Sequence, residues 1–297
     1  MGKSTLMNRL LGQKLAVVTP KPQTTRNRII GVKNLPGAQI VYVDTPGIHK
    51  AKSSLNQYMV DQALGAVGEC DVALMLVEAP RLTPEELQTG FDPGEGNRAI
   101  IARLAKVHRP RILGLNKIDR LGDKSALLPL IESYQALLPW DAIIPISAAT
   151  GDGTEALEQA VVDRLPAGPA LYPEEMVTDR AERFLAAELV REQTYMLLSD
   201  ELPYSVAVTI ENFQEREDRK DVVIDAVIHV ERDSQKRIVI GEGGKMMKAI
   251  GSAARKQIEE MGGRPIYLEL RVKVLKGWRD DEEWLRRFGY KIKKKKR

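Results

Sequence analysis

The stretch Gln39–Gly47, with the sequence QIVYVDTPG, decides the fold of the first half of this 297-residue chain. Five mostly apolar residues, typical of a buried strand, lead directly into a polar turn that contains an acid, a proline and a glycine. The same order recurs at Arg111–Asp119 (RILGLNKID) and at Ile143–Ala148 (IIPISA). We therefore expect the three polar turns to lie at one edge of a sheet, where doubly wound α/β folds bind their ligands.

Amphipathic stretches lie between these apolar runs. Strands are expected at 39–43, 72–77, 111–115 and 143–146, and helices at 54–67, 98–107, 124–138 and 154–164. This alternation predicts a mainly parallel sheet with helices on both faces. Ile29–Lys33 is expected to pair with Gln39–Val43 as a hairpin, because Asn34–Gly37 has the composition of a tight turn. The glycine-rich segment Leu87–Gly96 is expected to be a surface loop.

A change of pattern near residue 165 indicates a second domain. Prolines and glycines between 165 and 173 are typical of a linker. Beyond it we expect a small α+β domain with a long helix at 180–198, strands at 205–210, 222–231 and 266–274, and a helix from 245 to about 261. By its periodicity alone, Lys236–Ile240 would also be a strand. The expected bounds are 1–168 for the first domain, 169–179 for the linker, 180–290 for the second domain and 291–297 for a basic tail.

Charge is divided unevenly between the two halves. Residues 180–297 hold 26 Lys and Arg against 21 Asp and Glu, a net of +5, whereas the rest of the chain holds 19 against 20, a net of −1. Six of the cations lie in the tail 291–297, so a polyanionic partner is expected there, with a solvated, frayed end as the alternative. The one cysteine, Cys70, cannot form an internal disulfide, and no apolar run reaches the roughly 20 residues that cross a bilayer, which favours a cytoplasmic location.

Gly2-Lys3-Ser4-Thr5 opens a helix and corresponds to the second half of a phosphate-binding loop. The helix N-terminus attracts phosphates, Lys3 would reach the β- and γ-phosphates, and the Ser4 hydroxyl would bind Mg²⁺. Asp44-Thr45-Pro46-Gly47 adds an acid that holds Mg²⁺ through water and a glycine N–H for the γ-phosphate. In the loop Pro20–Arg26, Thr25 is the candidate for a further contact with Mg²⁺ and the γ-phosphate. A helix start next to a serine is the alternative explanation for the first segment alone.

Asn116-Lys117-Ile118-Asp119 has the chemistry that distinguishes guanine from adenine. The carboxylate of Asp119 can accept two N–H bonds from guanine, and adenine has no matching donors. The stem of Lys117 can lie along the base, Asn116 can tie the loop to the phosphate side, and Ser147-Ala148 can offer a backbone N–H to the guanine carbonyl. Each segment alone could be an ordinary turn. Their coincidence in this order favours a site for GTP or GDP with Mg²⁺.

These segments together resemble the translation-factor-related GTPases. Pro22-Gln23-Thr24-Thr25-Arg26 and the second half of the chain resemble the Era family of bacterial GTPases in particular. The resemblance covers essentially the whole chain and implies an α/β P-loop GTPase domain with a doubly wound, mostly parallel sheet, followed by a small α+β type II KH domain. Gly241–Lys245 then corresponds to the G-x-x-G loop between two helices of a KH domain, which makes Lys236–Ile240 a helix. The implied RNA contacts are Ile240, Gly241, Gly243, Gly244, Lys245 and Lys248.

The resemblance implies a switch protein that binds and hydrolyses GTP, binds small-subunit ribosomal RNA, and assists small ribosomal subunit assembly and rRNA maturation. A cytoplasmic monomer is expected, with a weak peripheral contact between the basic tail and anionic membrane as an addition. Ile48 stands where Ras-like proteins carry a water-orienting glutamine, so slow intrinsic hydrolysis is expected and no catalytic residue is assigned. Glu242 places an acid inside the G-x-x-G loop, where it would repel phosphate.

The chain departs from the family at its beginning. The family's phosphate loop starts one strand before Gly2, and Met1 stands where the family usually has valine. The absent strand would lie in the middle of the sheet, which would leave two unpaired edges. Our hypothesis is a misplaced start at an internal GUG codon. Two alternatives remain: an RNA-binding assembly factor that binds no nucleotide in this N-terminally truncated form, or a peripheral membrane protein held by its tail, for which a second membrane signal is missing.

Overall fold

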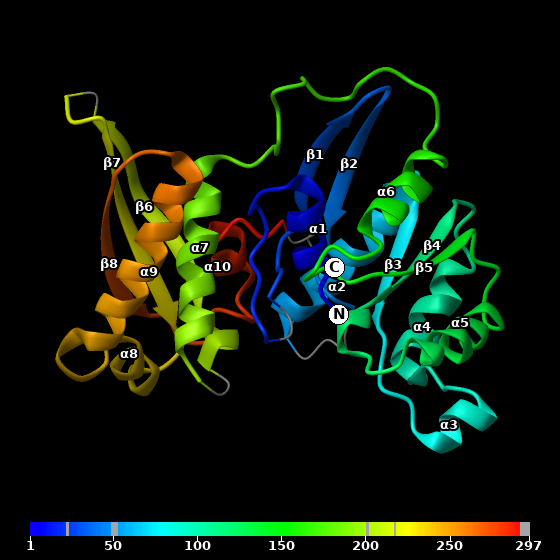
Figure 1. Ribbon diagram of the computed structural model, residues 1–297. Coiled ribbons are helices and arrows are strands. Elements are labelled where there is room, and N and C mark those ends of the chain that lie inside the picture. Colours follow the sequence, from blue (N-terminus) through cyan, green and yellow to red (C-terminus); the bar gives the residue numbers. More distant parts are fainter. Residues whose placement is uncertain (22–23, 49–52, 200–201, 217, 292–297) are drawn as a thin grey trace, which may run out of the picture. The chain divides into compact units, whose positions relative to one another are not determined.

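The computed structural model describes residues 1–21, 24–48, 53–199, 202–216 and 218–291 (Figure 1). The chain divides into two compact units. The first comprises 1–16, 28–49 and 62–178, and the second comprises 17–27, 50–61 and 179–297. All but the first residue of the predicted basic tail lies outside the described residues. None of the described helices combines the length and apolar character that a membrane crossing requires.

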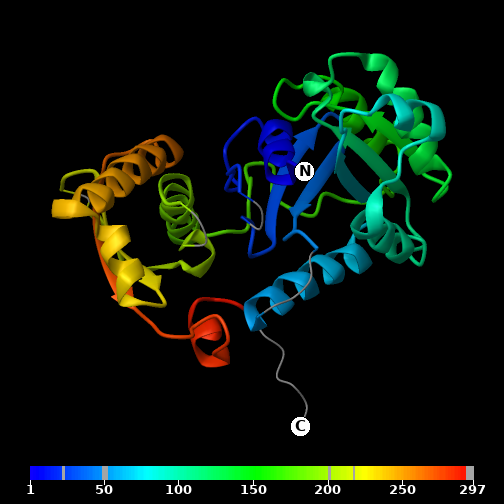
Figure 2. The same ribbon diagram turned by 90° about the horizontal axis from the view of Figure 1, so that it is seen from below.

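The first unit alternates strands with helices, as expected. Its strands are β1 (Ile29–Leu35), β2 (Ala38–Asp44), β3 (Ala73–Glu78), β4 (Arg111–Asn116) and β5 (Ala142–Pro145). Its helices are α1 (Lys3–Leu11), α3 (Pro84–Thr89), α4 (Gly94–Leu104), α5 (Leu127–Gln135), α6 (Thr154–Val162) and the end of α2 (Ser54–Glu69). Figure 2 shows α2 as one continuous helix, and its residues up to Asp61 belong to the second unit.

Two sheets form in the first unit. β3, β4 and β5 are parallel and neighbour one another in that order, so the polar turns after β4 and β5 lie at one edge, as expected. The third expected turn, Asp44–Gly47, lies at the end of β2, which belongs to a separate sheet. β1 and β2 form the expected antiparallel hairpin, with Leu35 opposite Ala38. Within the part of the chain that the structure describes, β2 and β3 make no ladder with each other.

Apolar side chains cover the β3-β4-β5 sheet on both faces. The alternation of β4 directs Leu113 and Leu115 to one face and Ile112 to the other, and all three are fully buried. On the first face they meet Leu130 and Tyr134 of α5, and the second face carries residues of α1 and α6. Burial on both faces explains why these strands are nearly continuous apolar runs in the sequence.

The predicted surface loop Leu87–Gly96 is wrong at both ends. Its first residues belong to α3, and its last residues begin α4. The reason is local: Thr83 and Glu86 form a reciprocal capping box, and Pro84 occupies the first helical turn, where its missing N–H costs nothing. Of the glycines in the segment, Gly90 ends α3, whereas Gly94 and Gly96 lie in the first turn of α4.

The second unit is a three-stranded sheet with helices. Its elements are α7 (Glu182–Leu197), β6 (Ala207–Arg216), β7 (Asp221–Val230), α8 (Asp233–Ile240), α9 (Lys245–Gly262), β8 (Ile266–Val274) and α10 (Glu282–Arg287). β7 is the central strand, antiparallel to β6 and parallel to β8, and α7 and α9 pack on the sheet (Figure 1). Lys236–Ile240 is helical, as the KH resemblance implies, so the strand that periodicity alone predicts is wrong.

The second unit also contains two segments from the first half of the chain. Arg26 is 2% exposed, and its guanidinium donates to the carbonyl oxygens of Val206 and Tyr204 and to the Tyr195 hydroxyl. It also lies 5.7 Å from the centroid of the fully buried Trp278 ring, within cation–π range. The start of α2 packs in the same apolar cluster as Trp278. Three strong donor contacts and an aromatic face are what a buried arginine needs in order to remain charged.

Candidate nucleotide and RNA sites

The start of α1 has the geometry of an anion site. Gly2 precedes the helix with φ +90°, a left-handed conformation that favours glycine. A Cβ at this position would also lie only 2.6 Å from Nδ2 of Asn116, so no other residue fits without displacement. Lys3, Ser4 and Thr5 follow within the first turn, where backbone N–H groups lack helical acceptors and the helix dipole favours negative charge.

The predicted phosphate and Mg²⁺ residues of the first unit lie together. Ser4 Oγ donates to Asp44 Oδ2 at 2.7 Å, and Asp44, the last residue of β2, is buried. The Lys3 ammonium lies 3.8 Å from the position that a Cβ of Gly47 would occupy, so Asp44-Thr45-Pro46-Gly47 runs beside the start of α1. A hydroxyl and a carboxylate are oxygen ligands of the kind that Mg²⁺ prefers, so these residues fit the ion.

Thr25 is the exception among the predicted Mg²⁺ ligands. It is buried and belongs to the second unit, immediately before the anchored Arg26. Its contact with Mg²⁺ therefore stays a prediction.

Asn116 joins the two ends of the predicted site. It is 1% exposed, its Nδ2 donates to the Met1 carbonyl oxygen at 2.7 Å, and its Oδ1 accepts from the Ala148 N–H at 2.9 Å. One carboxamide thus ties the β4 turn both to the residue before Gly2 and to the β5 turn. The role that the sequence suggests for Asn116, linking the guanine loop to the phosphate side, has this physical basis.

Asp119 is oriented by the turn after β5. Ser147 Oγ donates to Asp119 Oδ1 at 2.6 Å, and the same hydroxyl accepts from the Thr150 N–H at 3.1 Å. The guanidinium of Arg9, on α1, donates to the carbonyl oxygens of Ala148 and Ala149. The acceptor expected to recognise guanine is thus fixed before any ligand arrives, and preorganisation of this kind lowers the entropy lost on binding.

Lys117 has an unusual backbone and a partner that the sequence does not reveal. Its φ is +69°, and among the described residues only Lys220 is another non-glycine with positive φ. Its ammonium donates to Oε2 of Glu78, the last residue of β3, at 2.5 Å. This hydrogen bond is the main cause that lowers the pKa of Glu78 below its ordinary value, so the carboxylate is ionised at neutral pH.

The second unit carries the predicted RNA loop between α8 and α9. Gly241, Gly243 and Gly244 all have positive φ, and a Cβ on Gly241 would lie 2.7 Å from that of Met246. The loop therefore needs glycine for its conformation and for the close approach of the α9 start. Lys245 and Lys248 are exposed beside it, and Ile240 is half-buried at the end of α8. Glu242 is 93% exposed, 4.0 Å from the Lys245 ammonium.

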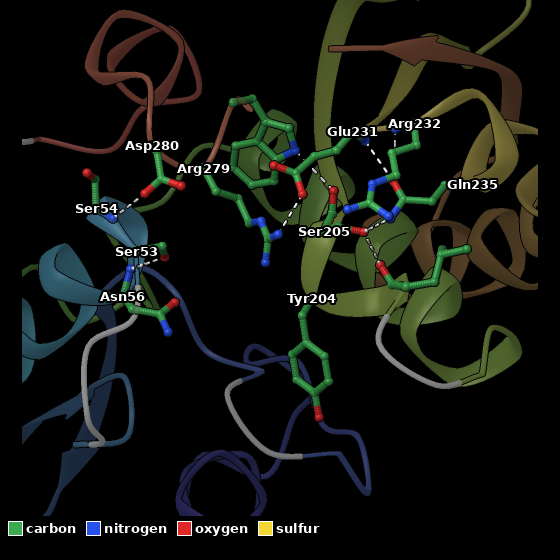
Figure 3. A network of polar contacts seen from close by, with 12 residues as sticks. Ser53, Ser54, Asn56, Tyr204, Ser205, Glu231, Arg232, Gln235, Arg279 and Asp280 are labelled. Atoms are coloured by element: carbon green, nitrogen blue, oxygen red, sulfur yellow. Dashed lines mark hydrogen bonds and ion pairs between the residues drawn. The ribbon is translucent and has the colours of Figure 1, made fainter. Parts of the chain in front are cut away.

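A polar network holds the start of α8, the helix that leads into this loop (Figure 3). Gln235 Oε1 accepts from the Glu231 and Arg232 N–H groups, and Gln235 Nε2 donates to Ser205 Oγ at 3.0 Å. The Glu231 carboxylate in turn accepts from the Arg279 guanidinium at 2.6 Å. These contacts satisfy donors at the helix start and fix its direction.

Sequence reasoning assigns no role to four residues: Arg9 and Glu78, which contact the guanine-side turns, Gly153, where a Cβ would lie 2.2 Å from the Pro145 carbonyl oxygen, and Arg26, which is anchored within the second unit. Only Gly153 has a local signal in the sequence, since a glycine stands directly before the predicted helix 154–164, and the structure gives it φ +72°. The partners of the other three lie at least 39 positions away in the chain.

Comparisons with known proteins find matches for both halves of the chain. Residues 1–117 match a family described as 50S ribosome-binding GTPase, and residues 201–279 match the KH domain. The GTPase Era of Geotalea daltonii is 49% identical over 290 residues, which is 98% of this chain and 94% of that relative. The GTPase Era of Lacticaseibacillus paracasei is 46% identical over 293 residues, or 99% of this chain and 94% of that relative.

Two crystal structures resemble the whole chain at 40% identity and a TM-score of 0.90, each covering 98% of this chain and 95% of the other. One is Era in complex with MgGDPNP and nucleotides 1506–1542 of 16S ribosomal RNA, and the other is an Aquifex aeolicus Era variant bound to GDP·AlF4⁻. Nearly half of the residues are identical along almost the full length of the chain, so the match extends well beyond the short motifs. We conclude that the chain belongs to the Era family of GTPases.

Proposed function

We propose that this chain is a switch protein that binds and hydrolyses GTP, binds small-subunit ribosomal RNA through its KH domain, and assists small ribosomal subunit assembly and rRNA maturation. The membership of the Era family supports the proposal, as does the 16S ribosomal RNA fragment in one of the related structures. As domain bounds we propose 1–168 for the GTPase domain, 169–179 for the linker, 180–290 for the KH domain and 291–297 for the basic tail.

The nucleotide-binding part of the proposal rests on the hydrogen bonds that hold the side chains of Asn116 and Asp119 in place. Asn116 bridges Met1 and Ala148, and Ser147 orients the Asp119 carboxylate. A carboxylate held in this way matches the two adjacent N–H donors of guanine and offers nothing to adenine. The Ala148 N–H, which donates to Asn116 Oδ1 at 2.9 Å, would have to exchange that acceptor for the guanine carbonyl when the nucleotide binds. The phosphates would then extend toward the start of α1.

For hydrolysis, the side chains at the start of α1 bind and neutralise the phosphates. Lys3 would contact the β- and γ-phosphates, and Ser4 and Thr25 would hold Mg²⁺, with Asp44 acting through water. When bound, Mg²⁺ neutralises charge on the phosphates. Ile48, the residue after Gly47, has no group that orients the attacking water, so we expect slow hydrolysis until a ribosomal or RNA contact accelerates it.

For RNA, the Gly241–Lys245 loop binds the backbone of a short single strand. Its glycines allow close approach, and Lys245 and Lys248 supply exposed cations for phosphate. A carboxylate at Glu242 opposes them, which limits the affinity of this loop.

Nucleotide affinity tests the first half of the proposal. We expect the chain with Mg²⁺ to bind GDP and GTP but not ADP. Asp119→Asn replaces the acceptor by an amide whose NH₂ faces two guanine donors, so GDP affinity should fall about 1000-fold while affinity for the xanthine nucleotide rises. Unchanged GDP binding by Asp119→Asn would contradict the assignment of the guanine site.

RNA affinity tests the second half. A fluorescent oligonucleotide with the 3′-terminal sequence of small-subunit ribosomal RNA should bind in a salt-dependent manner. Lys245→Ala with Lys248→Ala should weaken it about tenfold or more and lower its salt dependence, because two phosphate contacts are lost. Lys256→Ala, on the same helix but paired with Glu260, is the matched control.

The alternative, an RNA-binding assembly factor without nucleotide binding, predicts RNA binding with no GDP or GTP affinity. Comparing this chain with a form extended upstream through the strand that the family carries separates the two. We further propose a cytoplasmic monomer, whose tail 291–297 makes at most a weak, salt-sensitive contact with anionic lipid. Sedimentation with anionic vesicles at physiological salt measures that contact.

A further inference from the structure

We infer that Glu78 is a positioning residue for the guanine nucleotide, because it holds the ammonium of Lys117 and so keeps the lysine stem along the plane of the base. This inference rests on the proposed nucleotide function. It assigns a role to an acid in β3 that lies outside all the sequence segments from which the guanine site is predicted.

Strand pairing brings Glu78 to the site. Glu78 is the last residue of β3 and lies in register opposite Asn116, the last residue of β4. The next residue, Ala79, donates its N–H to the Asn116 carbonyl oxygen at 2.8 Å, which extends the ladder past the strand ends. Because the two strands are parallel, both side chains leave the sheet at the edge where the nucleotide is expected.

The contact itself is short and charge-assisted. Lys117 Nζ lies 2.5 Å from Glu78 Oε2, while the nearest Arg120 nitrogen is 3.9 Å from Oε1 and the Met1 amino nitrogen is 3.8 Å from Oε2. Of these three cations, only Lys117 is within hydrogen-bond distance. The Glu78 carboxylate therefore interacts mainly with the Lys117 ammonium.

The backbone of Lys117 is fixed on both sides. Asn116 before it makes two side-chain hydrogen bonds, and the Ile118 N–H after it donates to the Ile146 carbonyl oxygen at 3.2 Å. Between them Lys117 adopts a left-handed conformation that is unfavourable for an L-residue, so the surrounding contacts maintain it. This backbone directs the side chain, but a lysine stem still has four rotatable bonds.

Glu78 removes much of this remaining freedom. A lysine that is free in solution loses rotamer entropy when a base packs on its stem. If the ammonium is already held, the free protein has lost part of that entropy before the nucleotide arrives, and binding becomes tighter. Only one of the three ammonium protons is used by Glu78, so two remain for the nucleotide or the phosphate loop.

An exposed ion pair without function is the competing explanation. The Glu78 side chain is 44% exposed and that of Lys117 25% exposed, and pairs in such positions add little to stability. The two explanations therefore differ in one measurable respect. A positioning role requires a loss of nucleotide affinity on substitution of Glu78, without a matching loss of thermal stability.

The test measures affinity and dissociation rate of a fluorescent GDP analogue for the full chain with Mg²⁺. Glu78→Gln keeps the shape and removes the charge, and it should weaken GDP about three- to tenfold, mainly through faster dissociation. Asp92→Asn, which breaks an exposed ion pair with Arg98 in the same unit, is the matched control and should change affinity by less than about 1.5-fold. With GTP, Glu78→Gln should raise KM more than it lowers kcat.

A double-mutant cycle decides whether Glu78 acts through Lys117. In a Lys117→Ala background, Glu78→Gln should change GDP affinity by less than about 1.5-fold. With Lys117 intact, Glu78→Asp should retain part of the wild-type GDP affinity, because the carboxylate is kept. An equal loss in both backgrounds, or no loss in the wild type, would overturn the inference while leaving GDP binding by the wild-type chain intact. Absence of GDP binding by the wild-type chain would instead overturn the proposed nucleotide function, and this inference with it.

Discussion

Replacing Asn116 by alanine should separate the phosphate side of the nucleotide site from its guanine side. Asn116 is 1% exposed and makes two hydrogen bonds, to the Met1 carbonyl oxygen at 2.7 Å and from the Ala148 N–H at 2.9 Å. Alanine removes both and leaves the two backbone groups without these partners. No direct contact with nucleotide needs to be lost for affinity to fall.

The magnitude follows mainly from the burial of Asn116 and Ala148. Leaving a buried donor or acceptor unsatisfied costs about 1–3 kcal/mol, so the two groups together cost roughly 2–6 kcal/mol, with the carbonyl of the exposed Met1 toward the lower end. Part of this cost appears as lower stability of the free protein, and the rest must be supplied by the nucleotide when it reassembles the loops. We expect GDP affinity to fall about 100-fold, equivalent to about 2.7 kcal/mol, with a decrease of a few degrees in Tm.

Titration with a fluorescent GDP analogue measures the loss of affinity, and thermal unfolding measures the loss of stability. Asn97→Ala is the matched control, because the Asn97 Nδ2 also makes two hydrogen bonds, to Pro93 and Tyr134, in the same unit but outside the site. It should leave GDP affinity within about twofold of wild type. Asn116→Asp should be at least as damaging as alanine, because a carboxylate would face the Met1 carbonyl oxygen. A folded Asn116→Ala protein that binds GDP within about threefold of wild type would refute this reasoning.

Three further predictions concern the second unit. Trp278→Phe removes the indole N–H that donates to the Ser205 carbonyl oxygen at 3.0 Å in a fully buried site, so its free energy of unfolding in urea should fall by about 2 kcal/mol. Burial lowers the pKa of His229 from 6.5 to about 4, so the unfolded chain binds more protons than the folded one between these values. Unfolding free energy should therefore decrease as pH falls from about 6.5 to about 4, and His229→Gln should flatten this part of the urea-midpoint profile. Glu242→Gln removes an exposed acid from the RNA loop and should tighten RNA binding about two- to fivefold at low salt, an effect that should shrink at high salt and be absent in Glu283→Gln.

Some outcomes show where local sequence signals suffice and where they are misread. Thr83-Pro84-Glu85-Glu86 contains a complete capping box, so α3 could have been predicted from the sequence. The glycines that follow favoured the prediction of a loop instead. Lys236–Ile240 is too short for its periodicity to distinguish a helix from a strand, and only the resemblance to a KH domain gives the observed helix.

The sequence by itself determined the alternation of strands and helices, the order of the polar turns and the family, because each depends on neighbouring residues or on short segments at fixed spacing. Only the tertiary structure decided which groups those segments meet. Asn116 bonds to Met1, 115 positions away, Arg26 bonds to Val206, 180 positions away, and Lys117 bonds to Glu78, 39 positions away. No local periodicity encodes such pairs, because they arise when strands align in register and when distant segments share one core.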